Sequence, residues 1–166
     1  MGLKADAEYP TLEEIKEDYA ALRVISPAYA GREGELTAVL QYVYQSIVLS
    51  AIGESETSRL LMNIAVTEMH HLEILGTLIA KLGAIPAFVK CPPYPVGYYS
   101  ASNVNYVKFP EGMLTVDLIG EKNAIAGYEA MCCLLANEKV KQVILRIIED
   151  EKVHVAALEA ELKKFR

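Results

Sequence analysis

Glu68-Met69-His70-His71 and Glu151-Lys152-Val153-His154 are the two Glu-x-x-His stretches that decide how this chain folds. In an α-helix, residues i and i+3 project to nearly the same side, one turn apart. Each stretch therefore predicts a helix that presents a carboxylate and an imidazole side by side. Such a pair can bind one metal ion.

Each Glu-x-x-His stretch has a partner upstream in the sequence. The partners are Gly34-Glu35 and Gly120-Glu121, and each Glu is followed seven residues later by a tyrosine, Tyr42 or Tyr128. The order Glu, then Glu-x-x-His, thus occurs twice. We interpret the two copies as two equivalent helix hairpins.

The candidate metal ligands all fall on apolar helix stripes, and they are Glu35, Glu68, His71, Glu121, Glu151 and His154. Burying an unpaired carboxylate costs several kcal/mol, so four of them in an apolar seam require cations. Two divalent ions would balance the four negative charges. Carboxylate and imidazole ligands without thiolates favour iron or manganese, and the ligand chemistry does not choose between the two.

The hydrophobic periodicity predicts an all-α protein. Four long helices are expected at about 31–52, 55–82, 112–135 and 138–165, after a short leading helix from Thr11 to about Val24 that a Thr11–Glu14 capping box would start. The segment 84–111 is rich in proline and tyrosine and reads as a long crossover. Two short hairpins joined by one long crossover describe a ferritin-like four-helix bundle. The expected organisation is an N-terminal arm, 1–30, and the bundle, 31–166.

Length and composition narrow the function classes. A chain of 166 residues suits one domain with a substantial core. The net charge of −6, without any Lys/Arg cluster, excludes nucleic acid as the expected partner. No apolar stretch of about 20 residues or secretory signal is visible, so we expect no membrane association. The three cysteines are an odd count without a Cys-x-x-Cys pair, which indicates a reducing, cytoplasmic compartment.

The chain resembles the ferritin-like superfamily of di-metal carboxylate proteins, and within it the rubrerythrins and manganese catalases. The resemblance is carried by Gly34-Glu35-Leu-Thr-Ala-Val-Leu-Gln-Tyr42-Val-Tyr-Gln, Glu68-Met-His-His71-Leu-Glu and Glu151-Lys-Val-His154, and it extends over about Gly31 to Leu162. Three scattered cysteines cannot form the Cys₄ iron module that rubrerythrins carry.

The resemblance implies a role for each candidate residue. Glu68 and Glu151 would bridge two iron or manganese ions, Glu35 and Glu121 would be terminal ligands, and His71 and His154 would bind one ion each. Tyr42 and Tyr128 are the catalytic candidates, as hydrogen-bond donors behind the ligands. The implied activity is that of a peroxidase- or catalase-like oxidoreductase, with hydrogen peroxide or dioxygen as substrate. An external electron donor stays open as a partner, and a homo-oligomer, dimer or larger, is expected.

Several alternatives stay open at the level of sequence. The same bundle could oxidise and store iron, or bind metal without turning over peroxide. His70 lies about 100° away from the seam and reads as a surface or interface histidine rather than a ligand. Glu129 lies two turns after Glu121 and is either a solvated residue or a further acidic group at the site. Glu73, Glu149 and Asp150 read as solvated.

Overall fold

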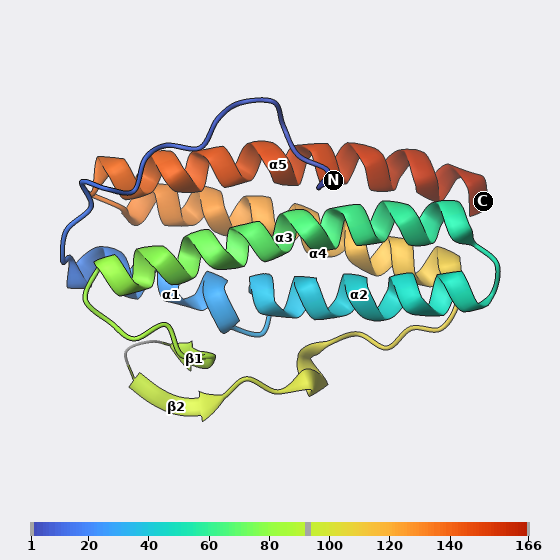
Figure 1. Cartoon of the computed structure of the whole chain (residues 1–166), viewed down its shortest axis with the longest axis horizontal. Helices are drawn as coiled ribbons and strands as arrows, with labels where there is room; N and C mark the ends of the chain where they lie inside the picture. Colours follow the sequence, from blue (N-terminus) through green and yellow to red (C-terminus); the bar gives the residue numbers. More distant parts are fainter. Residues whose placement is uncertain (1, 92–93, 166) are drawn as a thin grey trace.

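The computed structural model describes the backbone of residues 2–91 and 94–165 and the side chains outside residues 90–96. Four long helices run side by side: α2 (Glu35–Ala51), α3 (Ser55–Lys81), α4 (Pro110–Leu134) and α5 (Glu138–Leu162) (Figure 1). Helix α2 packs mainly on α3 and α4 on α5, which gives two hairpins. The predicted ferritin-like four-helix bundle is confirmed.

Short turns close both hairpins. Gly53 lies between α2 and α3 with φ of +90°, and Gly83 follows α3 with φ of +104°, a region that side chains other than glycine rarely enter. These two glycines follow the predicted helix ranges 31–52 and 55–82 directly, and the helices end at those boundaries to within a residue. Between α4 and α5 the Asn137 side chain accepts a hydrogen bond from the Val140 amide, which caps the first turn of α5.

The leading helix was placed wrongly by the sequence analysis. Helix α1 is Tyr19–Ala30, begins after the Asp18 cap and includes Pro27, so the predicted Thr11 capping box does not start a helix. Residues before Asp18 instead form an extended arm, in which Ile15 is buried in the core. The arm (residues 2–18) runs along the bundle beside α5 (Figure 1). Burial of apolar arm residues across the bundle outweighs their local preference for helix.

The crossover between α3 and α4 travels the length of the bundle, as predicted (Figure 1). It contains a short antiparallel pair, β1 (Val89–Cys91) and β2 (Tyr94–Tyr98), and a 3₁₀ turn, η1 (Ala101–Asn103), which the sequence did not predict. Pro92 and Pro93, part of the predicted crossover, lie outside the described residues. A second 3₁₀ turn, η2 (Lys163–Phe165), follows α5, and α4 begins two residues before the predicted Gly112.

The hydrophobic core is divided into two clusters along the bundle. One joins α1 to α3, α4 and α5, and its members include Leu22, Ile25, Leu78 and Ile144. The other fills the opposite end, with Leu49, Leu61, Leu114 and Leu158 among its members. A group of buried charged residues on α2 to α5 completes the interior. Among the described residues no helix is both long and apolar enough to cross a membrane.

Candidate metal centre

The six predicted ligands meet in the interior of the bundle. They form two groups of four whose ligand atoms lie within 4.8 Å of one another: Glu35, Glu68, His71 and Glu151 in one, and Glu68, Glu121, Glu151 and His154 in the other. Each helix supplies what the sequence pattern assigned to it, with Glu35 on α2, Glu121 on α4, and a Glu-x-x-His pair on each of α3 and α5. Glu68 and Glu151 belong to both groups.

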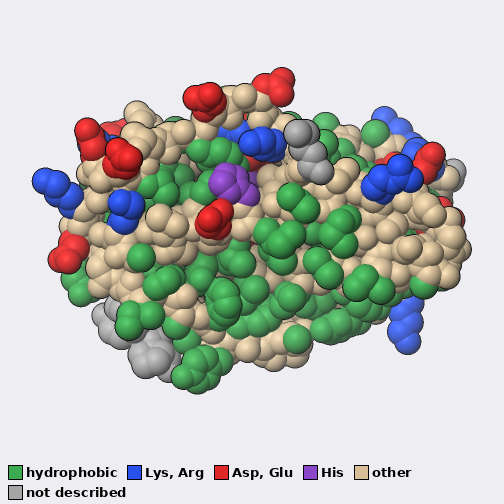
Figure 2. Space-filling model, viewed as in Figure 1, with side chains coloured by type: hydrophobic (Ala, Val, Ile, Leu, Met, Phe, Trp, Pro, Cys, Tyr) green, Lys and Arg blue, Asp and Glu red, His purple; other side chains and the backbone are tan. Residues whose placement is uncertain are grey.

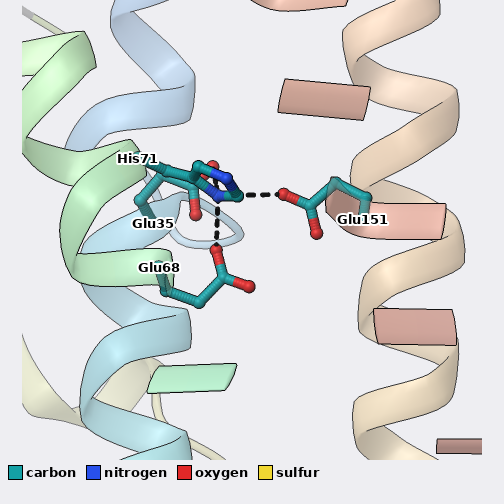
Figure 3. A group of neighbouring side chains, drawn as sticks. All are labelled: Glu35, Glu68, His71 and Glu151. Atoms are coloured by element: carbon teal, nitrogen blue, oxygen red, sulfur yellow. Dashed lines mark hydrogen bonds and ion pairs between the residues drawn. The ribbon is translucent and has the colours of Figure 1, made fainter. Parts of the chain in front are cut away.

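Each of the two shared carboxylates places one oxygen beside His71 and the other oxygen beside His154. Glu68 Oε2 lies 2.8 Å from His71 Nδ1, and Glu68 Oε1 lies 2.9 Å from His154 Nδ1. Glu151 repeats this with Oε1 at 3.2 Å from His71 Nδ1 and Oε2 at 3.3 Å from His154 Nδ1. Figure 3 shows the two contacts to His71, one from Glu68 on the same helix and one from Glu151 on the facing helix α5.

Each remaining carboxylate serves one histidine. Glu35 Oε1 lies 3.8 Å from His71 Nδ1, and Glu121 Oε2 lies 3.4 Å from His154 Nδ1. The arrangement thus has two positions related by pseudo-twofold symmetry. Each is surrounded by one imidazole, by the two shared carboxylates and by one carboxylate of its own, Glu35 or Glu121, which we call its private carboxylate.

The metal-free cluster is electrostatically self-compensating. Burial and the neighbouring carboxylates raise the pKa of Glu35 well above its usual range and raise that of Glu121 to about 8. Burial alone would raise the pKa of Glu68, but the two histidines bring it down to about 2. Burial would lower the pKa of His71 and His154, but Glu68 and the other hydrogen-bonded carboxylates raise both well above 6.5. Two imidazolium ions therefore face two carboxylates.

The donor set fits a pair of hard or borderline divalent cations. Glu68 Oε1, Glu151 Oε1 and His154 Nδ1 are buried and have no partner in hydrogen-bond geometry in the part of the chain that the structure describes, although all three lie within ion-pair distance of a neighbour. Ligand atoms whose lone pairs point at a common metal position are expected to lie close to one another without the geometry of a hydrogen bond. Oxygen and imidazole ligands of this kind suit a dinuclear manganese or iron site.

The two predicted tyrosines contact the cluster across the repeat. The Tyr42 hydroxyl on α2 donates to Glu121 Oε1, and the Tyr128 hydroxyl on α4 donates to Glu35 Oε1. Burial and the facing carboxylates raise the pKa of both phenols well above 10, so both keep their protons. Each tyrosine thus orients the private carboxylate that belongs to the other copy of the hairpin.

Asp150 is a functional candidate that the sequence analysis misassigned to solvent. Its side chain is fully buried, and Asp150 Oδ2 accepts a hydrogen bond from His71 Nε2 at 3.1 Å. Burial would raise the pKa of Asp150, but hydrogen bonds from His71, Tyr9 and Arg146 hold it well below its usual range. A charged acceptor behind a ligand imidazole fixes the ring and leaves Nδ1 free for a metal. The other acids read as solvated, Glu73 and Glu149, are exposed as expected.

The N-terminal arm supplies the equivalent bond to the second histidine. His154 Nε2 donates to the backbone carbonyl of Leu3 at 2.8 Å, and Thr67 Oγ1 donates to the same carbonyl. The arm also holds Asp150, through the Ala5 amide and the Tyr9 hydroxyl. Both imidazoles are therefore fixed from behind, one by a carboxylate and one by a carbonyl.

Alignment of the two hairpins could have drawn attention to Asp150. It directly precedes Glu151, and the equivalent position before Glu68 is Thr67. Both residues serve the histidine of the opposite hairpin, Asp150 directly and Thr67 through the Leu3 carbonyl. The hydrogen bond from His154 to the arm could not be predicted in this way, because a backbone carbonyl is present in every residue and gives no sequence signal.

His70 and Glu129 lie outside both ligand groups. His70 is partly exposed, packs edge-on against Tyr9 with ring centroids 4.8 Å apart and contacts Glu73, so the reading as a surface histidine is confirmed. Glu129 is exposed, which favours the solvated reading over an additional acidic group at the site.

A cavity of about 580 Å³ reaches the ligands from the side of α2 and α4. Four of the six candidate ligands line it: Glu35, Glu68, Glu121 and Glu151. The two glycines of the repeated Gly-Glu pair have different surroundings. A side chain at Gly34 would collide with the Ala28 carbonyl at 2.5 Å, whereas one at Gly120 would meet nothing within 4 Å and would project into open space.

Replacing Asp150 with asparagine should weaken metal binding by about 10- to 100-fold, the usual effect of losing a hydrogen-bond partner behind a ligand. The amide accepts a weaker bond from His71 and leaves Arg146 without its buried counter-ion. Calorimetric titration with Mn²⁺ measures the change. Glu149→Gln, an adjacent exposed acid, is the matched control. Equal affinity of Asp150→Asn and wild type would show that His71 needs no carboxylate behind it.

Comparison with known proteins agrees with the geometry. The family of manganese containing catalases matches residues 13–87. KatB, a manganese catalase from Anabaena, superposes with a TM-score of 0.80 at 21% identity, over 99% of this chain and 81% of that one. No curated protein sequence matches.

Bacterioferritins share the same architecture. The protein from Rhodobacter capsulatus gives a TM-score of 0.70 at 22% identity, covering 90% of this chain and 88% of that one. A dodecameric thioferritin from Bacteroides fragilis, a bacterioferritin-related protein, gives 0.71 at 17% identity, with 90% and 89% covered.

The chain has the fold of a ferritin-like four-helix bundle, and two carboxylate–histidine groups lie in its interior. Residues 13–87 are similar in sequence to the manganese containing catalases. The comparisons thus support the predicted resemblance, in fold over the chain and in sequence over residues 13–87.

Proposed function

We propose that this protein is a binuclear manganese or iron oxidoreductase that acts on hydrogen peroxide or dioxygen, in the manner of a peroxidase or catalase. The observation that carries the proposal is the position of Glu68 and Glu151, each with one oxygen beside either histidine. Carboxylates placed in this way can bridge two ions. The similarity of residues 13–87 to manganese containing catalases supports the same activity.

Each residue has a defined part in this proposal. Glu35 and His71 would hold one ion and Glu121 and His154 the other, with Glu68 and Glu151 shared. Two adjacent ions can bind both oxygens of a small substrate and exchange two electrons with it.

The tyrosines and the cavity complete the proposed site. Tyr42 and Tyr128 keep Glu121 and Glu35 oriented by hydrogen bonds. The cavity of about 580 Å³ gives peroxide a path to the carboxylates.

The test is to load the protein with manganese and, separately, with iron, to measure bound metal, and to assay peroxide consumption. We expect two ions per chain and release of dioxygen by a catalase, or consumption of an added reductant by a peroxidase. Fewer than one ion per chain under replete conditions would contradict the metal site. Two bound ions without peroxide turnover would contradict the catalytic proposal alone.

Iron oxidation and storage is the second candidate, because bacterioferritins share the fold. The mass of the assembly separates the two functions. A storage protein would assemble into a large cage and accumulate many iron atoms per chain, whereas the proposed enzyme retains two ions.

A homo-oligomer is part of the proposal for either function. Hydrophobic side chains gather on the face of the molecule over α2 and α3 (Figure 2). The exposed large apolar residues of these two helices include Leu40, Ile47, Val66 and Met69. A monomer rarely exposes a large apolar patch without a partner for it.

A further inference from the structure

A cluster of three polar side chains, Asp117, Gln41 and Gln45, lies beside the approach to the metal centre, and two of them line it. Asp117 lies on α4, one turn before Glu121, and its side chain is 1% exposed. Asp117 Oδ1 accepts hydrogen bonds from Gln41 Nε2 at 2.7 Å and from Gln45 Nε2 at 2.9 Å. Asp117 and Gln41 both line the cavity that reaches the ligands.

The second oxygen of this carboxyl group is an unexplained buried acceptor. Asp117 Oδ2 has no hydrogen-bond partner among the described residues, and neither has Gln45 Oε1. Leaving a buried polar atom without a hydrogen bond costs about 1–3 kcal/mol. Such an atom in a native fold therefore indicates a bound molecule that forms the missing hydrogen bond. Gln45 Oε1 can only accept a hydrogen bond, whereas Asp117 Oδ2 accepts one when the carboxyl group is ionised and donates one when it is protonated. Hydrogen peroxide can pair with both forms, because each of its oxygens carries an O–H and lone pairs.

The cluster also breaks the symmetry of the repeat. The positions equivalent to Asp117, Gln41 and Gln45 in the other copy of the hairpin are Gly31, Gly127 and Met131. Ligands and tyrosines are duplicated, whereas this polar group exists only beside Glu121. A structural polar contact required by the bundle would be expected in both copies. A group needed once per reaction is needed on one side only.

We propose that Asp117 donates a proton to peroxide in the cavity and later recovers one, with Gln41 and Gln45 fixing its carboxyl group. This inference rests on the proposed peroxide chemistry. Burial and the charge of Glu121 outweigh the two glutamine hydrogen bonds and raise the pKa of Asp117 to about 8, which supports a protonated carboxyl group at neutral pH. The glutamine contacts to Oδ1 direct that proton to Oδ2, on the unpaired side.

The proton balance defines when Asp117 would act. Reduction of one peroxide breaks its O–O bond, consumes two electrons and two protons, and yields two water molecules. Oxidation of a second peroxide yields dioxygen and returns two electrons and two protons. Asp117 gives one proton in the first half and takes one back in the second, while water in the cavity carries the other. A bound metal pair would supply the two electrons in the first half and recover them in the second.

Asp117→Asn tests the proposal, because the amide has nearly the same shape and cannot transfer the proton. In the manganese-loaded protein we expect two bound ions, as in wild type, and a kcat for peroxide lower by roughly 100-fold. The metal-free proteins are compared at pH 9, where Asp117 is ionised, and there we expect the melting temperature of the variant to be higher by about 2–4 °C. The amide N–H₂ gives this buried wall a donor where the carboxylate had an unpaired acceptor.

Glu129→Gln on the same helix is the matched control, since Glu129 is exposed, and it should change neither quantity. A kcat of Asp117→Asn within twofold of wild type would overturn the proposal. So would a loss of bound metal, which would make Asp117 a residue for metal loading, or a lower melting temperature, which would make it a structural partner. Wild-type protein with two ions and no peroxide turnover would instead overturn the proposed function, and the role of Asp117 with it.

Discussion

Glu68→Gln is expected to reduce bound manganese from two ions per chain to one or none. Both oxygens of Glu68 face imidazole nitrogens, at 2.8 Å and 2.9 Å, and of the other side chains that the structure describes only Glu151 is placed in this way. An amide nitrogen carries protons where the carboxylate offers a lone pair, so the bridge between the two positions is lost. Metal analysis after equilibrium dialysis gives the stoichiometry.

The same substitution should alter the metal-free protein. Glu68 is the carboxylate that most raises the pKa of both histidines. Without it, two buried imidazolium ions would face Glu151 alone, and removal of one partner from a buried ion pair costs about 3–5 kcal/mol. Glu73→Gln, an exposed acid on the same helix, is the control. A Glu68→Gln protein that is more stable than wild type and still binds two ions would show that the cluster is structural.

Metal loading is expected to release about four protons for every two divalent ions at neutral pH. In the metal-free cluster the raised pKa values leave protons on Glu35, Glu121, His71 and His154, while Glu68 and Glu151 are charged. The six side chains then carry a net charge of zero. Ligation requires all four protons to leave, after which two divalent ions restore the same neutrality.

The sign of the pH dependence follows from this exchange. The metal-free state binds more protons than the metal-loaded state, so acid favours the metal-free state. Between about pH 6 and pH 7, the product of the two binding constants should fall by up to about 10⁴ per unit decrease in pH. Calorimetry in two buffers of different ionisation enthalpy counts the protons. A release close to zero would mean that the ligands are already deprotonated before metal arrives.

The sequence was sufficient to predict the bundle and its ligand groups because their signals are local and periodic. Glu68 and His71 are one turn apart on α3, and Glu151 and His154 repeat the spacing on α5. Once four apolar stripes and a long crossover are recognised, few packings bring these pairs together. Tyr42 and Tyr128 were found by the same repeat.

The parts that the sequence analysis missed depend on long-range contacts. Thr11 and Glu14 carry the pattern of a capping box, but Ile15 is buried in the core with the arm extended, and α1 starts at the Asp18 cap instead. Asp150 lies between two glutamates in the sequence, a context that is typical of a solvent-exposed helix position. Only the assembled bundle shows that His71 and the arm cover it.

The bond between the Leu3 carbonyl and His154 has a consequence for the order of folding. It joins residues that are 151 positions apart in the sequence. Closing so long a loop costs more conformational entropy than forming contacts between neighbouring residues. Helix hairpins form from neighbouring residues and can be complete while the arm is still loose. The capacity for tight metal binding is therefore expected to arise last, when the N-terminal arm docks on α5.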